Sequence, residues 1–375
     1  MNQVAEKILA EVANHGPISF ARFMECALYC PVYGYYEKEQ DTLGRRGDYY
    51  TSLNVGPVFG ELLGLQFSAW LDHLRRGVTG QDLSSPLCLV EAGAHRGGLA
   101  RDVLDWFKAR RPDLYQTLEY RIVEPSLRRQ AWQKETLADC SDRVRWVRTL
   151  TDARSGAGGF GPVRGVILSN ELLDSMPVQR FGWDTRCRAW IEWGVAFDHG
   201  EFHWTPLPEP PPSHLVPDLP PQLLDSLPDG FITEVCPTAV QWWTQAAQVL
   251  QNGWLITIDY GLTDEELWRP ERTGGTLRSY LHHRLIADVL ANPGEQDLTA
   301  HVNFSNLIRF GEKAGLTTEA FCTQEQFLTR IAAPAFTDPS QLGVWSSERI
   351  RQFQTLTHPQ HLGRSFRVLV QSRGL

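Results

Sequence analysis

The stretch "LVEAGAHRGGLARDVLDW" at residues 89–106 starts as an apolar run, turns through glycines and continues with helical spacing. A buried strand, a glycine turn and a helix in this order are typical of a parallel α/β sheet. Gly93 would allow the tight turn, and Gly97 would let the helix pack closely on the strand. The new helix would offer free backbone N–H groups to a polar ligand. His95 is unexpected, because a glycine usually stands at this point of such a loop.

The same alternation continues along the chain. The apolar runs "EYRIVE", "RVRWV" and "GVILSN" follow, with helical segments near residues 97–110 and 126–139 between them. After an interruption come a helix near 238–250, the run "GWLITIDYG", a helix at about 304–314 and the final run "SFRVLVQS". We therefore predict the α/β class with a doubly wound parallel sheet, in which the last run is the closing strand.

Two parts of the chain depart from this pattern. Residues 1–80 read as helices around a long loop rich in Tyr and Gly, and we expect them to form an N-terminal cap. Residues 81–375 would form the core, with an insertion at about 180–235 in which "CRAWIEWGVAFDHGEFHW" predicts a β-hairpin before a proline-rich connection. The loop-rich segment at about 262–303 is expected to cover the open edge of the cleft.

Composition restricts the class of protein. The chain has 375 residues, 42% of them hydrophobic, and a net charge of −8, which disfavours binding to nucleic acid. Its seven cysteines are odd in number and contain no CxxC pair, so reduced core thiols are favoured over disulfides or zinc. His282, His283 and His301 lack the carboxylate or cysteine spacing of a metal site, and we expect no bound metal.

The start of the chain bears on its location. "MNQVAEKILAEVANHG" has neither a basic start nor a long apolar stretch, and resembles neither a secretory signal nor an Arg-rich transit peptide. No segment approaches the roughly 18–20 consecutive apolar residues of a membrane helix. We predict a cytoplasmic protein with no membrane span.

Polar side chains follow several of the predicted strands. Glu124 ends the second strand, where its carboxylate could accept hydrogen bonds from both hydroxyls of an adenosine ribose. It follows Gly93 by 31 positions (124 − 93), which is longer than the roughly 20 of the dinucleotide fingerprint. This spacing counts against NAD.

The fourth strand runs into "SNELLDSMPVQRF". If a helix starts here, Glu171 and Asp174 share one of its faces. The alternative is that Asn170 or Asp174 only caps that helix. "LITIDYG" brings Asp259 and Tyr260 to the same edge of the sheet.

Six motifs together resemble one family. "GDYYTS", "VEAGAHRGGLARDVL", "YRIVEPS", "SNELLDSMPVQRF", "LITIDYG" and "PGEQDLTAHVNF" occur in the order found in the MidA-like methyltransferases, and the resemblance covers residues 16–372. It implies a Rossmann-like class I methyltransferase fold and S-adenosylmethionine as cofactor. Mitochondrial members of that family are complex I assembly factors that methylate a protein arginine. The resemblance therefore implies a protein substrate, such as a subunit of a respiratory complex.

The resemblance also implies roles for individual residues. Glu91, Gly93 and Gly97 would surround the methionine part of the cofactor, and Glu124 would bind its ribose. The resemblance also implies that Gly47, Asp48, Thr51 and Ser52 close over the cofactor. His95 would contact the cofactor from the loop, and Asn170 would lie beside the methyl group. The residues on the reacting or acceptor side are Glu171, Asp174, Asp297, Thr299 and His301.

His95 is where the sequence departs from that family. The family loop reads Glu-x-Gly-Pro-Gly-x-Gly, whereas Ala94 and His95 here replace the Pro-Gly pair. Histidine adopts φ > 0 less readily than glycine but is among the residues enriched there. We expect cofactor binding to survive with altered affinity, and His95 to be a solvent-facing loop residue rather than a catalytic base.

The implied reaction needs alignment more than a nucleophile, since the sulfonium methyl is already activated. An arginine acceptor has a pKa above 12, and the carboxylates of Glu171 and Asp174 could grip two of its N–H groups. The proton would leave through Asp259 or His301. Two other classes stay open at this point: a binding or assembly protein that has lost turnover, and an NAD-dependent oxidoreductase, for which no catalytic group can be placed.

Overall fold

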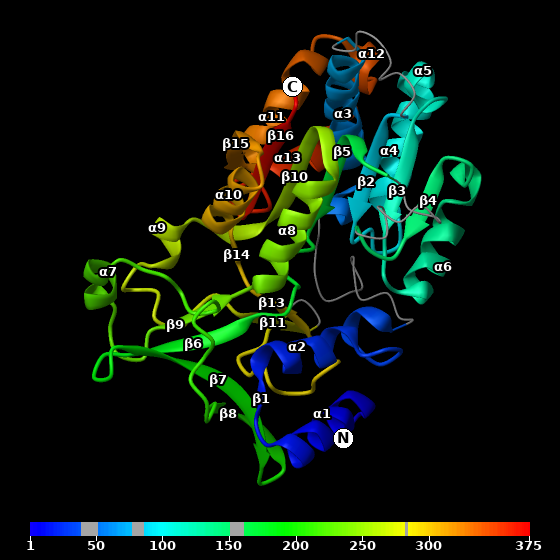
Figure 1. Cartoon of the computed structure of the whole chain (residues 1–375). Coiled ribbons are helices and arrows are strands. Elements are labelled where there is room, and N and C mark those ends of the chain that lie inside the picture. The colour runs from blue at the N-terminus through cyan, green and yellow to red at the C-terminus, as the bar shows by residue number, and fades with distance from the viewer. Residues whose placement is uncertain (39–51, 77–85, 151–160, 282–283) are drawn as a thin grey trace. The chain divides into compact units, whose positions relative to one another are not determined.

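The computed structural model describes residues 1–38, 52–76, 86–150, 161–281 and 284–375, which form two compact units (Figure 1). The sheet unit comprises Thr51–Leu173, Trp242–Tyr260 and Leu307–Leu375. The hairpin unit comprises Met1–Tyr50, Asp174–Gln241 and Gly261–Asn306. The chain therefore passes several times from one unit to the other.

The sheet unit contains a twisted sheet in the order β4-β3-β2-β5-β10-β16-β15. Strands β4, β3, β2, β5 and β10 run parallel, whereas β16 is antiparallel to both of its neighbours, β10 and β15. The predicted α/β class and the closing strand are confirmed, but the sheet is mixed rather than wholly parallel. Its strands are β2 (Cys88–Ala92), β3 (Glu119–Val123), β4 (Val144–Val147), β5 (Val163–Asn170), β10 (Leu250–Leu262), β15 (Thr317–Thr323) and β16 (Phe366–Arg373).

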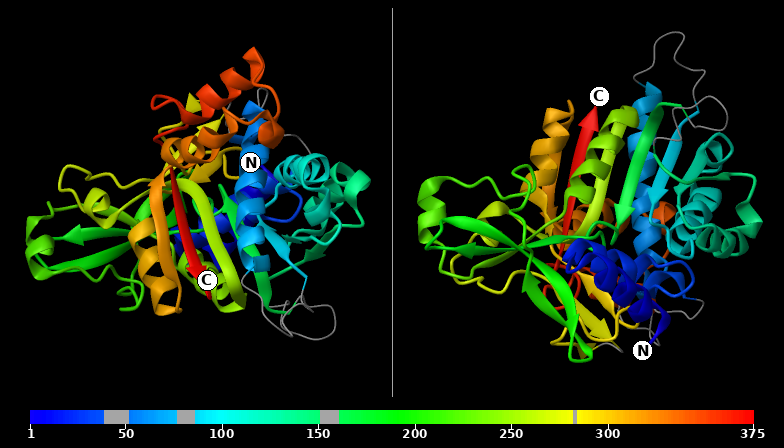
Figure 2. Two further views of the ribbon diagram at one scale, coloured as in Figure 1. Left: turned by 90° about the horizontal axis from the view of Figure 1, so that it is seen from above. Right: turned by 60° about the horizontal axis from the view of Figure 1, so that its bottom comes forward.

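Helices cover both faces of this sheet (Figure 2). Trp254, Ile256 and Ile258 of β10 alternate toward the main apolar core, which α3, α4, α11 and α13 complete. On the opposite face, Gln371 of β16 accepts a hydrogen bond from Trp243 of α8 and donates one to the Ile308 carbonyl of α10. The helices of this unit are α3 (Val58–Arg76), α4 (Gly98–Arg110), α5 (Pro112–Tyr115), α6 (Leu127–Thr136), α8 (Pro237–Val249), α10 (Phe304–Lys313), α11 (Gln324–Ala335), α12 (Pro339–Leu342) and α13 (Ser347–Thr357), with 3₁₀ turns η2 (Ser52–Val55) and η4 (Ala138–Cys140).

The strand order reverses between β2 and β5. From β2 the chain adds β3 and β4 on one side, and it then crosses to place β5 on the other side of β2. Open α/β sheets bind their ligands at such a switch point, beyond the carboxyl ends of the strands. The ends of β2, β3 and β5 are therefore the first place to look for a site.

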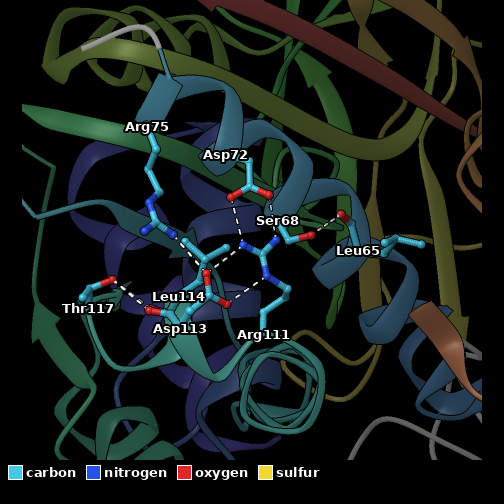
Figure 3. A network of polar contacts seen from close by, with 8 residues as sticks. All are labelled: Leu65, Ser68, Asp72, Arg75, Arg111, Asp113, Leu114 and Thr117. Atoms are coloured by element: carbon cyan, nitrogen blue, oxygen red, sulfur yellow. Dashed lines mark hydrogen bonds and ion pairs between the residues drawn. The ribbon is translucent and has the colours of Figure 1, made fainter. Parts of the chain in front are cut away.

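Helix α3 belongs to the sheet unit, so the units divide near residue 50, whereas the sequence suggested a boundary near residue 80. The reason is its apolar face: Phe59, Leu63 and Phe67 are buried in the main core. An ion-pair network also joins α3 to α5 (Figure 3). Arg111 donates to both oxygens of Asp72, at 2.8 and 2.9 Å, and to both oxygens of Asp113, at 3.0 and 2.9 Å.

The hairpin unit is mainly antiparallel. In its 5-stranded sheet β7 pairs with β1, β6 and β8, and β9 pairs with β6, while a second sheet has the order β12-β11-β13. The predicted hairpin is confirmed as β7–β8, and its turn residues His199 (φ 51°) and Gly200 (φ 90°) both have the positive φ of a type I′ turn. The elements are α1 (Gln3–His15), β1 (Ile18–Ser19), α2 (Phe20–Tyr29), η1 (Tyr35–Glu37), β6 (Gln179–Asp184), β7 (Ala189–Asp198), β8 (Glu201–Pro206), α7 (Pro221–Ser226), β9 (Ile232–Val235), α9 (Asp264–Leu267), β11 (Arg278–Leu281), β12 (Arg284–Leu285), β13 (Asp297–Thr299) and β14 (Val302–Asn303).

Candidate functional site

The loop between β2 and α4 is built for close approach of a ligand. Gly93, His95 and Gly97 have φ angles of 74°, 45° and 82°, so three positions of the loop lie in the left-handed region. Gly97 is the residue before α4, and no side chain of the described residues caps that end of the helix. The first N–H groups of α4 are therefore available, together with the positive end of the helix dipole, for a carboxylate of a ligand.

His95 adopts the positive φ that the glycine pattern of the loop predicts for this position. Its φ of 45° is the conformation in which glycine is favoured, and histidine tolerates it better than most residues. Its carbonyl accepts a hydrogen bond of 3.0 Å from Nε2 of Gln133. The residue is half-buried rather than fully solvent-facing.

Glu124 directly follows β3 and is buried, with 1% of its surface exposed. Oε1 accepts from the backbone N–H of Ser126 at 3.0 Å, and Oε2 accepts from Nε2 of Gln133 at 3.2 Å. The guanidinium of Arg129 also lies 3.2 Å from Oε1. The carboxylate is held in one orientation at the end of its strand, as the binding of a ribose diol would require.

Glu91 lies within β2 and is buried. Oε2 accepts a hydrogen bond of 2.6 Å from the hydroxyl of Tyr120 on β3. Burial raises the pKa of Glu91 to about 7, the bond from Tyr120 opposes this rise, and the charge of Asp102 adds to it. The carboxyl therefore titrates near neutral pH, two positions before Gly93.

At the end of β5, Asn170 and Glu171 interact through their side chains. Nδ2 of Asn170 donates to Oε1 of Glu171 at 3.1 Å. Oδ1 of Asn170 is buried and has no hydrogen-bond partner within the described part of the chain. A buried amide oxygen without a partner is costly, so this atom is a natural contact for a donor on a ligand.

The turn after β5 is organised by Asp259 of β10, which is fully buried. Oδ2 accepts from the N–H groups of Leu172 and Leu173 at 3.2 and 2.9 Å, and Oδ1 accepts from that of Tyr260 at 2.8 Å. Glu171 itself has a φ of 50°. Asp259 thus holds the turn that presents Glu171 instead of pointing to a ligand.

No helix begins after β5, so the predicted shared helical face of Glu171 and Asp174 is wrong. For the same reason neither Asn170 nor Asp174 caps a helix there. The left-handed φ at Glu171 breaks any helix at its first residue. The carboxylate of Asp259 captures the N–H groups of the next two residues.

Only part of the predicted N-terminal cofactor residues is described. The buried hydroxyl of Ser52 donates to Oε1 of Gln324 at 3.2 Å, and Gln324 directly follows Thr323, the last residue of β15. Gly47, Asp48 and Thr51 lie outside the described residues, as do His282 and His283. Their predicted roles stay predictions.

A second cluster of predicted residues lies within the hairpin unit. Asp174 and Asp297 are 6% and 4% exposed. The hydroxyl of Tyr36 donates to Oδ1 of Asp297 at 2.7 Å, and the Asp174 carbonyl accepts from the N–H of Ala300 at 2.9 Å. Burial raises the pKa of Tyr36, and so do the charges of Asp297 and Asp174.

Tyr280 is influenced by the same two carboxylates. Burial raises its pKa, and the charges of Asp297 and Asp174 raise it further, while Arg278 opposes this. Tyr29 adds another hydroxyl, which donates to the carbonyl and Oγ of Ser175 at 3.0 Å. The negative charges of Asp174 and Asp297 thus act on two tyrosines of this unit, Tyr36 and Tyr280.

His301 lies just after β13 in the same unit, and Thr299 ends that strand opposite Arg278. Burial lowers the pKa of His301 to about 4, and the neighbouring Arg278 and Arg272 lower it as well. Its Nδ1 is buried, with no hydrogen-bond partner among the described residues. The ring is therefore neutral at pH 7.

Neither a metal site nor a membrane helix is found in the described ranges. Within them, no group of three or more His, Cys, Asp or Glu side chains is arranged to hold a metal ion. None of the helices described is both long enough and apolar enough to cross a membrane.

Comparison with known proteins identifies the family. Residues 62–322 match the sequence family described as "Putative S-adenosyl-L-methionine-dependent methyltransferase". The chain belongs to this methyltransferase family. S-adenosylmethionine is thus its cofactor, and the NAD-dependent alternative is excluded.

Relatives and solved structures agree with this assignment. The methyltransferase is 30% identical to the "Protein arginine methyltransferase NDUFAF7, mitochondrial" of Danio rerio, over 98% of this chain and 85% of the relative. It is 27% identical to the Homo sapiens protein of that name, over 96% and 81%. A crystal structure of a Burkholderia thailandensis protein bound to S-adenosyl-homocysteine superposes with a TM-score of 0.81 at 30% identity, covering 99% of this chain and 92% of that one.

The relatives correct one expectation. Those from Danio rerio and Homo sapiens are mitochondrial proteins, which contradicts the predicted cytoplasmic location. That prediction relied on the composition of the first 16 residues and on unpaired cysteines, and neither feature identifies a compartment.

The chemistry of these residues in the sheet unit is compatible with the cofactor. The N-terminus of α4 could donate to the methionine carboxylate, the oriented carboxylate of Glu124 could accept from the ribose, and the buried Oδ1 of Asn170 could accept from a further donor. Sequence reasoning missed Gln133, which bonds both His95 and Glu124, because it lies in a polar helical segment. It also missed Tyr36 and Tyr120. The Tyr-rich loop was the only available signal for the former, and nothing distinguished the latter from an ordinary strand residue.

Proposed function

We propose that this methyltransferase transfers the methyl group to a guanidinium nitrogen of an arginine in a protein. The observation that carries the proposal is that Asp174 and Asp297 are both buried in the hairpin unit, where the hydroxyl of Tyr36 donates to Asp297 and both charges act on Tyr36 and Tyr280. A guanidinium offers a positive charge and several N–H donors, and carboxylates are the side chains that accept such donors most strongly. The names of the relatives from Danio rerio and Homo sapiens support the same substrate class.

In this proposal the cofactor is held by the sheet unit and supplies an activated, sulfonium-bound methyl group. Glu124 accepts the ribose hydroxyls, the loop from Gly93 to Gly97 surrounds the methionine part, and Asn170 and Glu171 contact the reacting end. Fixed dipoles and hydrogen bonds at these positions align the reactants, which is the main contribution that such a transfer needs.

The acceptor arginine stays charged until transfer, since no ordinary side chain removes a proton from a group with a pKa above 12. Asp174 and Asp297 accept N–H groups of the guanidinium and localise its charge. His301 is neutral at pH 7 and can take up the departing proton at its ring. Its pKa of about 4 makes it a transient carrier that passes the proton to water.

The identity of the acceptor protein is a finer proposal. The motifs shared with the MidA-like family favour a subunit of a respiratory complex. The test is transfer of a radiolabelled methyl group into a cell lysate, followed by mass spectrometry of the labelled protein. We expect methylarginine; label on another residue type would overturn the proposal.

Variants test the acceptor cluster directly. We expect Asp174→Asn and Asp297→Asn each to lower methyl transfer by about 100-fold, because each removes a charge that holds the guanidinium. Binding of S-adenosyl-homocysteine, measured by calorimetry, should be unchanged in both. Asp225→Asn, an exposed aspartate of the same unit paired with Arg188, is the matched control and should retain full activity. Full activity in both cluster variants would contradict the proposed roles.

A further inference from the structure

One buried amide connects the segments that follow β2 and β3 with the strand β4. Gln133 of α6 has no exposed surface. Its Nε2 lies 3.0 Å from the carbonyl oxygen of His95, after β2, and 3.2 Å from Oε2 of Glu124, after β3. Its Oε1 accepts a hydrogen bond of 2.9 Å from Nε1 of Trp146 on β4.

The partners fix which way this amide faces. The indole N–H of Trp146 can only donate, so Oε1 of Gln133 must point to it. The two N–H groups then face a carbonyl and a carboxylate, which can only accept. The orientation follows from chemistry as well as from atomic positions, and each of the two N–H groups has an acceptor of its own.

We propose that Gln133 is a positioning residue for the ribose of the cofactor. It holds the carboxylate of Glu124 and the His95 carbonyl at a fixed separation, so the glycine loop and the ribose acceptor keep one geometry. The proposal rests on the role proposed for Glu124. Ser126 and Arg129 contact the other carboxylate oxygen, Oε1, whereas Gln133 contacts Oε2.

The same contact explains how the loop tolerates a histidine. A side chain at a left-handed φ raises the energy of the loop relative to glycine. The bond from Gln133 to the carbonyl of that very residue favours the native loop over relaxed alternatives. Gln133 therefore both orients the carboxylate of Glu124 and stabilises the left-handed backbone at His95.

The test compares two ligands on one variant. Gln133→Leu keeps a similar volume and removes all three hydrogen bonds. We expect it to weaken binding of S-adenosyl-homocysteine by roughly tenfold, and binding of its 2′-deoxy analogue by less than about threefold, because the analogue gains less from an oriented Glu124. Calorimetry on the full chain measures both dissociation constants without any turnover.

Gln130→Leu is the matched control. Gln130 is a buried glutamine one turn earlier on α6, and its Nε2 donates at 2.8 Å to the backbone carbonyl of Glu124 instead of the carboxylate. We expect this variant to raise the dissociation constants of both ligands by the same factor. Equal weakening of both ligands in Gln133→Leu, or no weakening, would overturn the proposal.

Trp146→Phe keeps the test decisive if Gln133→Leu does not fold. It removes only the donor that orients the amide of Gln133. We expect the affinity for S-adenosyl-homocysteine to fall by about threefold, and the affinity for the 2′-deoxy analogue to fall by less. An equal loss for both ligands would count against the proposal. Glu124→Gln separates the two assignments: if it does not distinguish the ligands, the role proposed for Glu124 fails, and this inference fails with it.

Discussion

Individual residues in left-handed conformations mark the candidate cofactor site. His95 and Glu171 are both non-glycine residues with positive φ, and each follows a central strand of the sheet. Backbone strain of this kind persists where the surroundings enforce it, often at functional sites. The sequence exposed His95, because the residue breaks a glycine pattern. The positive φ of Glu171 was not predicted, because nothing in "SNELLD" marks the turn that Asp259 stabilises from a distant strand.

Replacing His95 by glycine tests whether the histidine matters for affinity. Glycine adopts φ 45° without strain, so we expect His95→Gly to bind S-adenosyl-homocysteine as tightly as the wild type or up to about tenfold more tightly. Calorimetric titration of both proteins measures this. Binding by the variant alone, with none in the wild type, would instead support a protein that has lost turnover.

Glu91 should make the stability of the sheet unit depend on pH. Its pKa rises from 4.5 to about 7 on folding, mainly through burial, so the folded state keeps a proton that the unfolded state releases. Between these values the free energy of unfolding therefore falls as pH increases, by up to about 3 kcal/mol in total. Urea denaturation at pH 5, 6, 7 and 8 would measure the effect.

The variant Glu91→Gln isolates this contribution. Its amide oxygen still accepts the bond from Tyr120, but the group no longer titrates. We expect the variant to gain stability relative to the wild type as pH rises through this window. Asp102, whose burial raises its pKa to about 6, titrates in both proteins. Parallel pH curves for the two proteins would show that Glu91 is not the titrating group.

At the scale of elements, burial decided what the sequence could predict. The central strands were found because they are buried on both faces and read as apolar runs. Strand β15 was missed because it is an edge strand, with no buried residue and little apolar signal. In α6 the buried positions are Gln130 and Gln133, so hydrophobic periodicity could not mark the face that carries Gln133.

The β7–β8 hairpin should be sensitive to one glycine. Gly200 has a φ of 90°, and a Cβ there would meet nothing within 4 Å. Gly200→Ala therefore costs backbone strain alone, about 1–2 kcal/mol of stability by thermal or chemical unfolding. Gly274 also has open space but no positive φ, so Gly274→Ala should cost nothing. A loss of the same size in both variants would refute the strain argument.

For the whole molecule, the sequence predicted the fold class, the hairpin and the strand-end residues, but not the division of the chain. Each unit is assembled from three separate segments. Local sequence patterns do not show which distant segments pack together. The apolar spacing of α3 would be the same whether the helix packed on an N-terminal cap or on the sheet. The contact of Tyr36 with Asp297 could not be foreseen for the same reason, since the two residues come from different segments of their unit.

The position of β16 has a consequence for biosynthesis. This strand lies between β10 and β15, yet it is the last of the three to leave the ribosome. Until then β10 and β15 each expose an unpaired edge, which is open to pairing with other chains. The nascent protein thus exposes two unpaired strand edges until β16 is inserted between them, and chaperones would protect it from aggregation during this interval.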